Sequence, residues 1–154
     1  MGRIYESMIT WLRDDEWTFR EVAEDHYVVL GVDGQNTHLR CVGTAHEDIE
    51  VFNFYAVIPG NVPDSTRPQV AEFITRANFG MRLGAFEMDY EDGELRFRTG
   101  VDLEGAPDEA LQAAIRQCVV AACATADRYY PGLMSVVYGG AGPREAIQQV
   151  EGAN

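Results

Sequence analysis

Two alternating segments on either side of Asp92-Gly93 constrain the fold more strongly than any other feature of the sequence. Apolar and charged residues alternate over 86–91 and again over 94–101. Such alternation is typical of strands with one buried face, and a two-residue Asp-Gly turn favours an antiparallel hairpin of fixed register. The apolar face is expected to pack beneath helices. The predicted cross-strand pairs are Tyr90 with Leu95, Met88 with Phe97, Asp89 with Arg96, and Glu87 with Arg98.

The remaining periodicity predicts an α+β fold built on an antiparallel sheet packed by helices. No repeat or shift in composition divides the 154 residues, so residues 1–154 are expected to form a single domain. The predicted order is α-β-β-β-α-β-β-α with a short C-terminal helix added. Helical spacing and capping residues predict helices at 3–13, 64–78, 107–130 and 143–150. Runs of β-branched and aromatic residues predict three further strands, at 26–32, 37–44 and 50–58.

Two of these elements lead to expectations about what covers them. In strand 50–58 both faces are apolar apart from Asn53, which predicts an inner strand covered on both sides. The long helix is expected to end at Tyr130, because Pro131-Gly132 follows. From Cys118 to Ala126 this helix is apolar almost all round. Either the C-terminal segment or another subunit is therefore expected to cover its second face.

The charge balance excludes two classes of partner. The chain has 25 acidic residues against 12 basic ones, all of them arginine, giving a formal net charge of −13 and a pI near 4.5. Nucleic-acid affinity comes largely from Lys and Arg that neutralise phosphates, and anionic membranes attract basic segments. Neither is therefore an expected partner. An acidic field keeps a protein soluble and can attract basic protein surfaces.

The cysteines and the N-terminus predict a cytoplasmic protein. Three cysteines, Cys41, Cys118 and Cys123, cannot all pair within one chain. Cys118 and Cys123 lie five residues apart on a predicted helix and point to different faces, so buried reduced thiols are expected. Glu6 interrupts the first apolar segment, which does not resemble a signal peptide. The apolar run 118–126 is too short to span a bilayer.

The residues that could bind a metal or act as nucleophiles do not form a site. His38, Cys41 and His46 come nearest to a metal cluster, but His38 and Cys41 project from opposite faces of one strand. A nucleophilic Cys41 would need His26 or His46 as its base. No helix N-terminus or basic cluster is predicted beside this thiol to activate it, and Arg40 points to the other face. No metal, cofactor or catalytic residue is therefore predicted.

The other candidate groups have structural explanations. Asp89 with Asp102 or Glu104 could supply paired carboxylates for acid–base catalysis. The neighbouring Arg96 and Arg98 predict solvated ion pairs instead, and the acidic run 14–16 lies in a loop. Gly80 and Gly84 lack the flanking residues of a phosphate loop. Gly139-Gly140-Ala141-Gly142 before Pro143 predicts a loop leading into a helix, where the net charge disfavours an anion site. The aromatic residues considered for contacts, and assigned to the core, are Trp11, Trp17, Phe19 and Tyr55.

Several segments taken together resemble a known family. They extend from about Trp17 to Glu151, and the likeness is strongest from Val70 to Gly139. The segments are 70–78, Gly84, 86–90, Asp92-Gly93, 95–101, 130–133, Val136, Gly139 and 143–147. In their order and spacing these residues resemble the YbjN-like family, described as bacterial sensory transduction regulators.

The resemblance implies a fold and a class of function. The family looks like the type III secretion chaperones, which are small acidic proteins that often dimerise and bind extended protein segments. A non-enzymatic regulatory or protein-binding role, as a chaperone-like adaptor, and a homodimer are therefore expected. The family supplies no catalytic residue or cofactor, and the resemblance does not show that a secretion system is served.

Two classes of function remain open at this point. The first is a protein-binding regulator whose partners are basic or extended protein segments, motivated by the acidic composition, the missing catalytic set and the apolar helix. The second is a small-ligand sensor or cryptic enzyme with a pocket between the long helix and the sheet. A deep, enclosed cavity with convergent polar groups would favour the second class.

Overall fold

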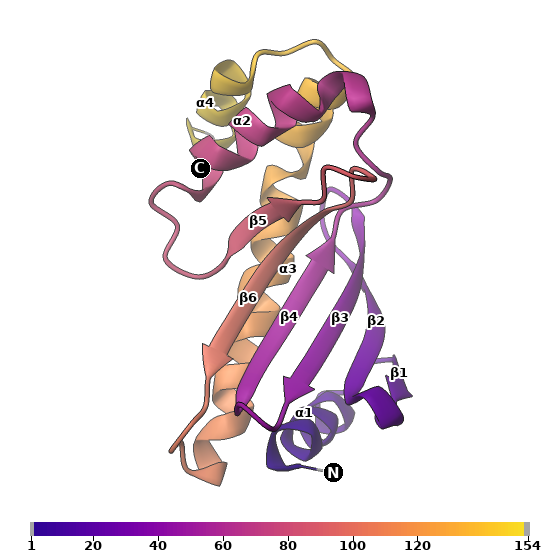
Figure 1. The fold of residues 1–154 in the computed structure, drawn as a ribbon, viewed down its shortest axis with the longest axis vertical. Coiled ribbons are helices and arrows are strands. Elements are labelled where there is room, and N and C mark those ends of the chain that lie inside the picture. The colour runs from indigo at the N-terminus through magenta and orange to yellow at the C-terminus, as the bar shows by residue number, and fades with distance from the viewer. Residues whose placement is uncertain (1, 153–154) are drawn as a thin grey trace.

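The computed structural model describes residues 2–152 and confirms the α+β fold (Figure 1). Its six strands form one antiparallel sheet in the order β1-β2-β3-β4-β6-β5. The helices are α1 (Arg3–Asp14), α2 (Arg67–Asn78), α3 (Asp108–Val137) and α4 (Pro143–Gly152). The strands are β1 (Phe19–Val22), β2 (Tyr27–Asp33), β3 (His38–His46), β4 (Val51–Val57), β5 (Ala85–Met88) and β6 (Leu95–Asp102). Short 3-10 turns, η1 (Ala23–Asp25) and η2 (Asp64–Thr66), precede β2 and α2.

The core lies between the sheet and the helices on one of its faces. Helices α1 and α3 pack on this face, and α2 and α4 pack around the C-terminal half of α3 (Figure 1). The hydroxyl of Thr99 on β6 donates a hydrogen bond to the carbonyl oxygen of Cys118 on α3 over 2.8 Å. The buried strand residues on this face include Val28, Leu30, Leu39, Cys41, Ala45, Phe52, Phe54, Ala56, Phe86, Leu95, Phe97 and Thr99.

Strand β4 is an inner strand, as predicted, but helices cover only one of its faces. Phe52, Phe54 and Ala56 are buried against the helices, while the alternating residues are half-buried on the other face. The expectation that both faces are covered is therefore wrong for the described part of the chain. On this second face Tyr55 lies opposite Val42 of β3. Apolar residues here pack against cross-strand neighbours instead of a second layer.

The sheet has one strand more than the sequence predicted. Strand β1 has only four residues and pairs with β2 at one edge. Arg20 and Glu21 in its centre are both exposed, so it has no buried face to produce an alternating pattern. The pairing with β2 extends the sheet without contributing a row of core residues.

Helix α3 does not end at Tyr130 but continues through Pro131 to Val137. A proline inside a helix removes the hydrogen bond to the carbonyl four residues earlier, here that of Asp127. The side-chain amide of Asn36, in the β2–β3 turn, donates to this carbonyl oxygen over 3.0 Å. The predicted helix end is wrong because a residue 91 positions away supplies the missing donor.

The hairpin forms, but its predicted register and turn are wrong. Met88 pairs with Leu95 and Glu87 with Arg96, which shifts the register by two residues. Strand β5 ends at Met88, and residues 89–94 form a longer loop closed by a hydrogen bond from the N–H of Asp89 to the carbonyl of Glu94. A shift of two residues preserves which side chains share a face. Tyr90, predicted on the apolar face, is instead 55% exposed.

The C-terminal segment covers the second face of the long helix only in part. Helix α4 packs against the end of α3, where Gly132 lies close to Val150. The segment 118–126 keeps an uncovered side, on which Val120 is 49% exposed. Helix α4 thus covers the later turns of α3 and leaves the apolar run 118–126 uncovered on one side.

Candidate functional site

A free strand edge is the most distinctive feature of the sheet. Strand β5 pairs with β6 only from Leu95 to Arg98, whereas β6 continues to Asp102. On the side away from β4, residues 99–102 therefore face no strand of the part of the chain that is described (Figure 1). Backbone N–H and C=O groups alternate between the two sides of a strand, so this stretch offers unpaired hydrogen-bonding groups. We call residues 99–102 the free β6 edge.

Gly84 is the last residue before β5 begins to pair with β6 at Ala85. Its φ of +79° lies in the left-handed region, which glycine adopts without a steric penalty. A β-carbon at this position would contact the carbonyl oxygen of Arg98. On the other side, the amide of Asn78 donates to the carbonyl of Phe86 over 3.0 Å and accepts from its N–H over 2.8 Å. Between these anchors the loop 79–84 bends away and leaves the free β6 edge open.

A small apolar recess borders this edge on the helix side. It has a volume of about 160 Å³, and its walls include Val101 and the small α3 residues Ala114 and Ala121. Leu83 lies at its mouth and is 57% exposed. The hydrogen bond from Thr99 to α3 fixes the distance between strand and helix. The recess can therefore accept an apolar side chain of modest size.

A second recess borders the same edge on the uncovered face of the sheet. Its lining includes Asn53, Arg98, Gly100 and Asp102, so it is polar and has charges of both signs. The side-chain amide of Asn53 donates to the carbonyl of Thr99 over 3.4 Å. Successive side chains of an added strand would point alternately to the two faces. The free β6 edge thus suits an extended segment in which apolar and polar residues alternate.

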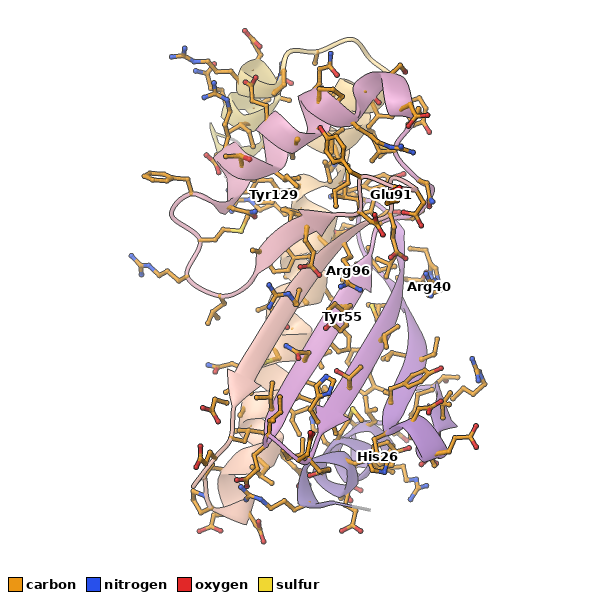
Figure 2. All side chains as sticks on the ribbon, viewed as in Figure 1. His26, Arg40, Tyr55, Glu91, Arg96 and Tyr129 are labelled. Carbon is orange, nitrogen blue, oxygen red and sulfur yellow. The ribbon has the colours of Figure 1, made fainter. Side chains whose placement is uncertain are left out.

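The uncovered face beside this edge is held by ion pairs and one cation–π contact. Glu87 accepts hydrogen bonds from Arg96 over 2.6 Å and from Arg98 over 3.1 Å. The Arg96 guanidinium lies 4.2 Å from the ring centre of Tyr55 (Figure 2). Arg40 forms a further pair with Glu94 at 3.6 Å. Glu87 replaces Asp89 as the partner of Arg96, but the conclusion that this face neutralises its own charges holds.

The candidate metal ligands and thiol bases are not brought together. His38 projects from the uncovered face and contacts Asp33 over 2.6 Å, while Cys41 is buried beneath the sheet. His46 contacts Thr44, and the His26 ring lies 5.8 Å from that of Tyr5. Within residues 2–152, no group of three or more His, Cys, Asp or Glu side chains could hold a metal ion.

The candidate carboxylates cap turns. Asp89 and Asp102 each accept the backbone N–H two residues later, from Glu91 and Glu104 respectively, over 2.9 Å. Asp15 accepts the indole N–H of Trp17 over 2.8 Å. Of the four aromatic residues assigned to the core, Trp11 is buried, whereas Trp17, Phe19 and Tyr55 are half-buried.

Two tyrosines have raised pKa values for structural reasons. Burial and a hydrogen bond to Glu21 raise the pKa of Tyr5 to about 12. Burial and a 2.7 Å hydrogen bond to Glu151 raise the pKa of Tyr129 to about 12. Both hydroxyls donate to a carboxylate and neither lines the recesses at the free β6 edge.

A larger groove lies on the opposite side of α3. Its volume is about 830 Å³, and it is open to solvent between the β2–β3 turn, α3 and α4. The carboxylate of Asp127 on its wall accepts backbone N–H groups of Gln35, Asn36 and Thr37 over 2.9–3.1 Å. Cys123 also lines it. We call this space the α3 groove.

A family comparison identifies the chain. The model of the YbjN family, described as "Putative bacterial sensory transduction regulator", matches residues 5–133. The chain belongs to the YbjN family. A comparison with curated protein sequences gives no match. No helix within residues 2–152 combines the length and the apolar character that crossing a membrane requires.

Solved structures confirm the chaperone-like fold that the sequence resemblance implied. The ExsC–ExsE complex contains a chain that is 11% identical, with a TM-score of 0.58 over 84% of this chain and 92% of that one. YbjN from E. coli is 14% identical, with a TM-score of 0.53 over 77% of this chain and 84% of that one. At these identities the likeness concerns the fold.

The free β6 edge was missed by sequence reasoning because its existence depends on where β5 begins, at Ala85 opposite Arg98. A two-residue turn would have let the pairing continue along the hairpin. Gly84, immediately before Ala85, was the available signal, since an isolated glycine beside a strand often marks a bend.

Proposed function

We propose that this protein is a non-enzymatic, protein-binding regulator that accepts an extended partner segment as an additional strand along the free β6 edge. The observation that supports this proposal most directly is the stretch 99–102, which pairs with β4 on one side and with no strand of the described residues on the other, between an apolar and a polar recess. Main-chain hydrogen bonds would supply affinity, and the two recesses would select alternating side chains. The role is that of a chaperone-like adaptor.

The comparisons support a regulatory or protein-binding role. The YbjN family model is described as a sensory transduction regulator, and one protein of similar fold is described in complex with a second protein. The net charge of −13 adds a preference for partners that are basic around the added strand. Weakening of the complex by added salt would support this preference.

Site-specific photo-crosslinking in the native cell tests where the partner binds. A photoreactive amino acid replaces Leu83, at the mouth of the apolar recess, or Tyr138, which is 73% exposed at the C-terminal end of α3. A discrete heterologous product is expected from position 83 and not from position 138. The substitution Leu83→Glu should reduce capture of that partner at least tenfold, because a charge would enter an apolar recess. Tyr138→Glu is the matched control. Equal crosslinking from both positions would contradict the proposal.

We also propose a homodimer formed around Phe79, which directly follows α2. Phe79 is 91% exposed, the largest exposed fraction among the large apolar side chains of the described residues, and a second copy of the chain would remove it from water. Light scattering on the eluting protein should give about twice the chain mass of 17.1 kDa. Phe79→Asp should return the protein to a monomer, whereas Tyr138→Asp should not. A monomer at micromolar concentration would contradict the dimer and leave the partner proposal standing.

We further propose that residues 1–154 act as one domain in the cytoplasm and bind neither nucleic acid nor membranes. The excess of acidic residues supports the two exclusions. Cell fractionation, gel-shift assays with nucleic acid and flotation with anionic vesicles are the measurements. Binding in either assay at physiological salt would contradict the exclusions.

The small-ligand alternative receives less support. The recess between α3 and β6 has about 160 Å³, which is below the roughly 300–1,000 Å³ of typical ligand pockets. The larger α3 groove is open and lies outside the layer between α3 and the sheet. Polar side chains on its wall, such as Asp127, are already occupied by backbone N–H groups.

A further inference from the structure

Two of the three cysteines lie side by side although they are far apart in sequence. The Sγ atoms of Cys41 on β3 and Cys123 on α3 are 3.9 Å apart, and 82 positions separate the residues. Cys41 is fully buried, while Cys123 is half-buried and lines the α3 groove. One thiol of the pair is therefore reachable from solvent and the other is shielded directly behind it.

The elements that hold the two thiols are fixed relative to each other. Strand β3 pairs along its length with β2 and β4. Asp127, one helical turn after Cys123, binds the backbone of the β2–β3 turn through its carboxylate. A disulfide has an S–S distance of about 2.05 Å, so the sulfur atoms must approach by roughly 2 Å. Rotation about the two Cα–Cβ bonds is the movement available for this approach.

The contact between the sulfur atoms makes the two thiols chemically different. The hydrogen-bonding contact with Cys41 lowers the pKa of Cys123. The same contact, together with burial, raises the pKa of Cys41. The thiolate is the reactive form of cysteine, so the solvent-reachable Cys123 is the attacking group. Cys41 is then placed to resolve whatever forms on Cys123.

We propose that Cys123 and Cys41 form a peroxide-reactive modification site that closes to an intramolecular disulfide. The Cys123 thiolate attacks one oxygen of a hydroperoxide, the O–O bond breaks, and Cys123 becomes a sulfenic acid as hydroxide or alkoxide leaves. The Cys41 sulfur then attacks the Cys123 sulfur, the S–O bond breaks, and the hydroxyl leaves as water with the Cys41 proton. With hydrogen peroxide the sum is two thiols and one peroxide giving one disulfide and two waters.

The bond would tie the sheet to the helix that covers it. It joins β3 to α3 across the core and closes a long chain segment, which restricts the unfolded chain more than the folded one. It also removes the free thiol from the wall of the α3 groove. This site is independent of the free β6 edge, because Cys41 and Cys123 do not line either recess there.

Thiol counting after peroxide treatment tests the proposal, with Cys118 as an internal control. Cys118 is buried and its carbonyl accepts from Thr99. Wild type and Cys118→Ala, treated with a small molar excess of hydrogen peroxide, should each lose two free thiols and two hydrogen atoms of intact mass. Peptide mapping without reductant should join Cys41 to Cys123, and dithiothreitol should reverse the change. The oxidised protein should melt roughly 10 °C higher than the reduced one.

Variants that lack one cysteine each distinguish the roles of the two thiols. Cys41→Ala should accumulate a sulfenic acid on Cys123 that dimedone traps, and Cys123→Ala should keep its two thiols under the same treatment. Cys123 is half-buried, so its variant keeps the fold even if Cys41→Ala does not, and circular dichroism checks both. An unchanged thiol count in wild type would overturn the proposal. So would disulfides between chains, or sulfinic acid on Cys123 without the Cys41 bond.

Discussion

Pro131 lies inside α3 because a side chain from another element replaces the hydrogen bond that the proline removes. Asn36 donates to the carbonyl of Asp127, and the Asp127 carboxylate in turn binds the backbone of the turn that contains Asn36. Helix and turn therefore satisfy each other's unpaired groups. This exchange also places the β2–β3 turn beside the last third of the helix.

The coupling between Asn36 and Pro131 gives the first prediction. Asn36→Ala should lower the free energy of unfolding by about 1 kcal/mol, since one hydrogen bond to a backbone carbonyl is lost. In a Pro131→Ala background the new N–H can bond the same carbonyl, so the cost of Asn36→Ala should fall close to zero. Urea unfolding of the four proteins in a double-mutant cycle measures the difference. An equal cost in both backgrounds would show that Asn36 does not compensate for the proline.

The raised pKa of Tyr129 predicts that the protein loses stability at alkaline pH. Its folded-state pKa of about 12 lies above the value of about 10 for a free tyrosine. The folded state therefore holds the proton more tightly, and this contribution is complete below pH 10 and is lost as the pH rises through 12. Between pH 9 and 12, wild type should lose on the order of 2 kcal/mol more than Tyr129→Phe.

The control is built into the substitution. Phenylalanine keeps the ring contacts of Tyr129 with Phe73 and Phe86 and lacks the titrating hydroxyl. Tyr5, whose pKa is raised in the same way, remains in both proteins and cancels from the comparison. Parallel pH profiles for the two proteins would rule out Tyr129 as a source of the loss.

At the scale of elements, the hairpin shows how a tertiary contact changes a local preference. The carbonyl of Gly93 accepts from the N–H of Val62 over 2.8 Å, and the amide of Asn61 donates to the carbonyl of Asp92 over 3.0 Å. The loop 89–94 is thus attached to the segment before α2. A two-residue turn would satisfy the hairpin alone, whereas the longer loop also satisfies these groups.

Two glycines with nearly the same backbone conformation test this attachment. Gly93 has φ +80° and a β-carbon there would contact the carbonyl oxygen of Val62, while Gly105 has φ +75° and open space around it. Gly105→Ala should cost about 1 kcal/mol of stability through backbone strain alone. Gly93→Ala should cost roughly 3 kcal/mol, because the loop must also move away from Val62. Equal costs, measured by denaturant unfolding, would mean that the contact with Val62 is unimportant.

The extent to which the sequence predicts these elements follows from where their determinants lie. Helices α1 and α2 and the faces of β6 were predicted because apolar spacing within each segment reflects burial directly. The continuation of α3 depends on Asn36, and the start of β5 at Ala85 depends on the close approach of Gly84 to Arg98. The free β6 edge and the Cys41–Cys123 contact join residues distant in sequence, so no local pattern contains them.

Across the whole molecule, the one-sided arrangement of helices explains why the sheet keeps an accessible face and edge. Helices α1 and α3 bury one face. On the other face the alternate residues of β4 are half-buried, and Tyr55 lies beside Arg96 (Figure 2). A fold of this type stabilises its core with a single layer of contacts. Because the core lies on one face only, an exposed strand edge does not disrupt a second core on the other face.

The net charge leads to a prediction for the molecule as a whole. Acidic residues outnumber basic ones by 25 to 12, so the folded state concentrates negative charge that salt can screen. Exposed ion pairs such as Arg76–Glu72 each contribute no more than about 1 kcal/mol and are also screened. Repulsion between the acidic side chains should outweigh the attraction within these ion pairs. Raising NaCl from about 0.01 M to 0.2 M shortens the Debye length from about 30 Å to below 10 Å and should raise the melting temperature by roughly 5 °C.

A variant of lower charge separates repulsion from other effects of salt. Glu24, Asp25 and Glu91 form no ion pair within residues 2–152. Replacing them with Gln, Asn and Gln changes the net charge from −13 to −10 with little change in shape. This variant should melt higher than wild type at low salt and respond less to added NaCl. A melting temperature that falls with salt in both proteins would show instead that the ion pairs outweigh the repulsion, and the acidic surface would then stabilise the fold through its arginine partners.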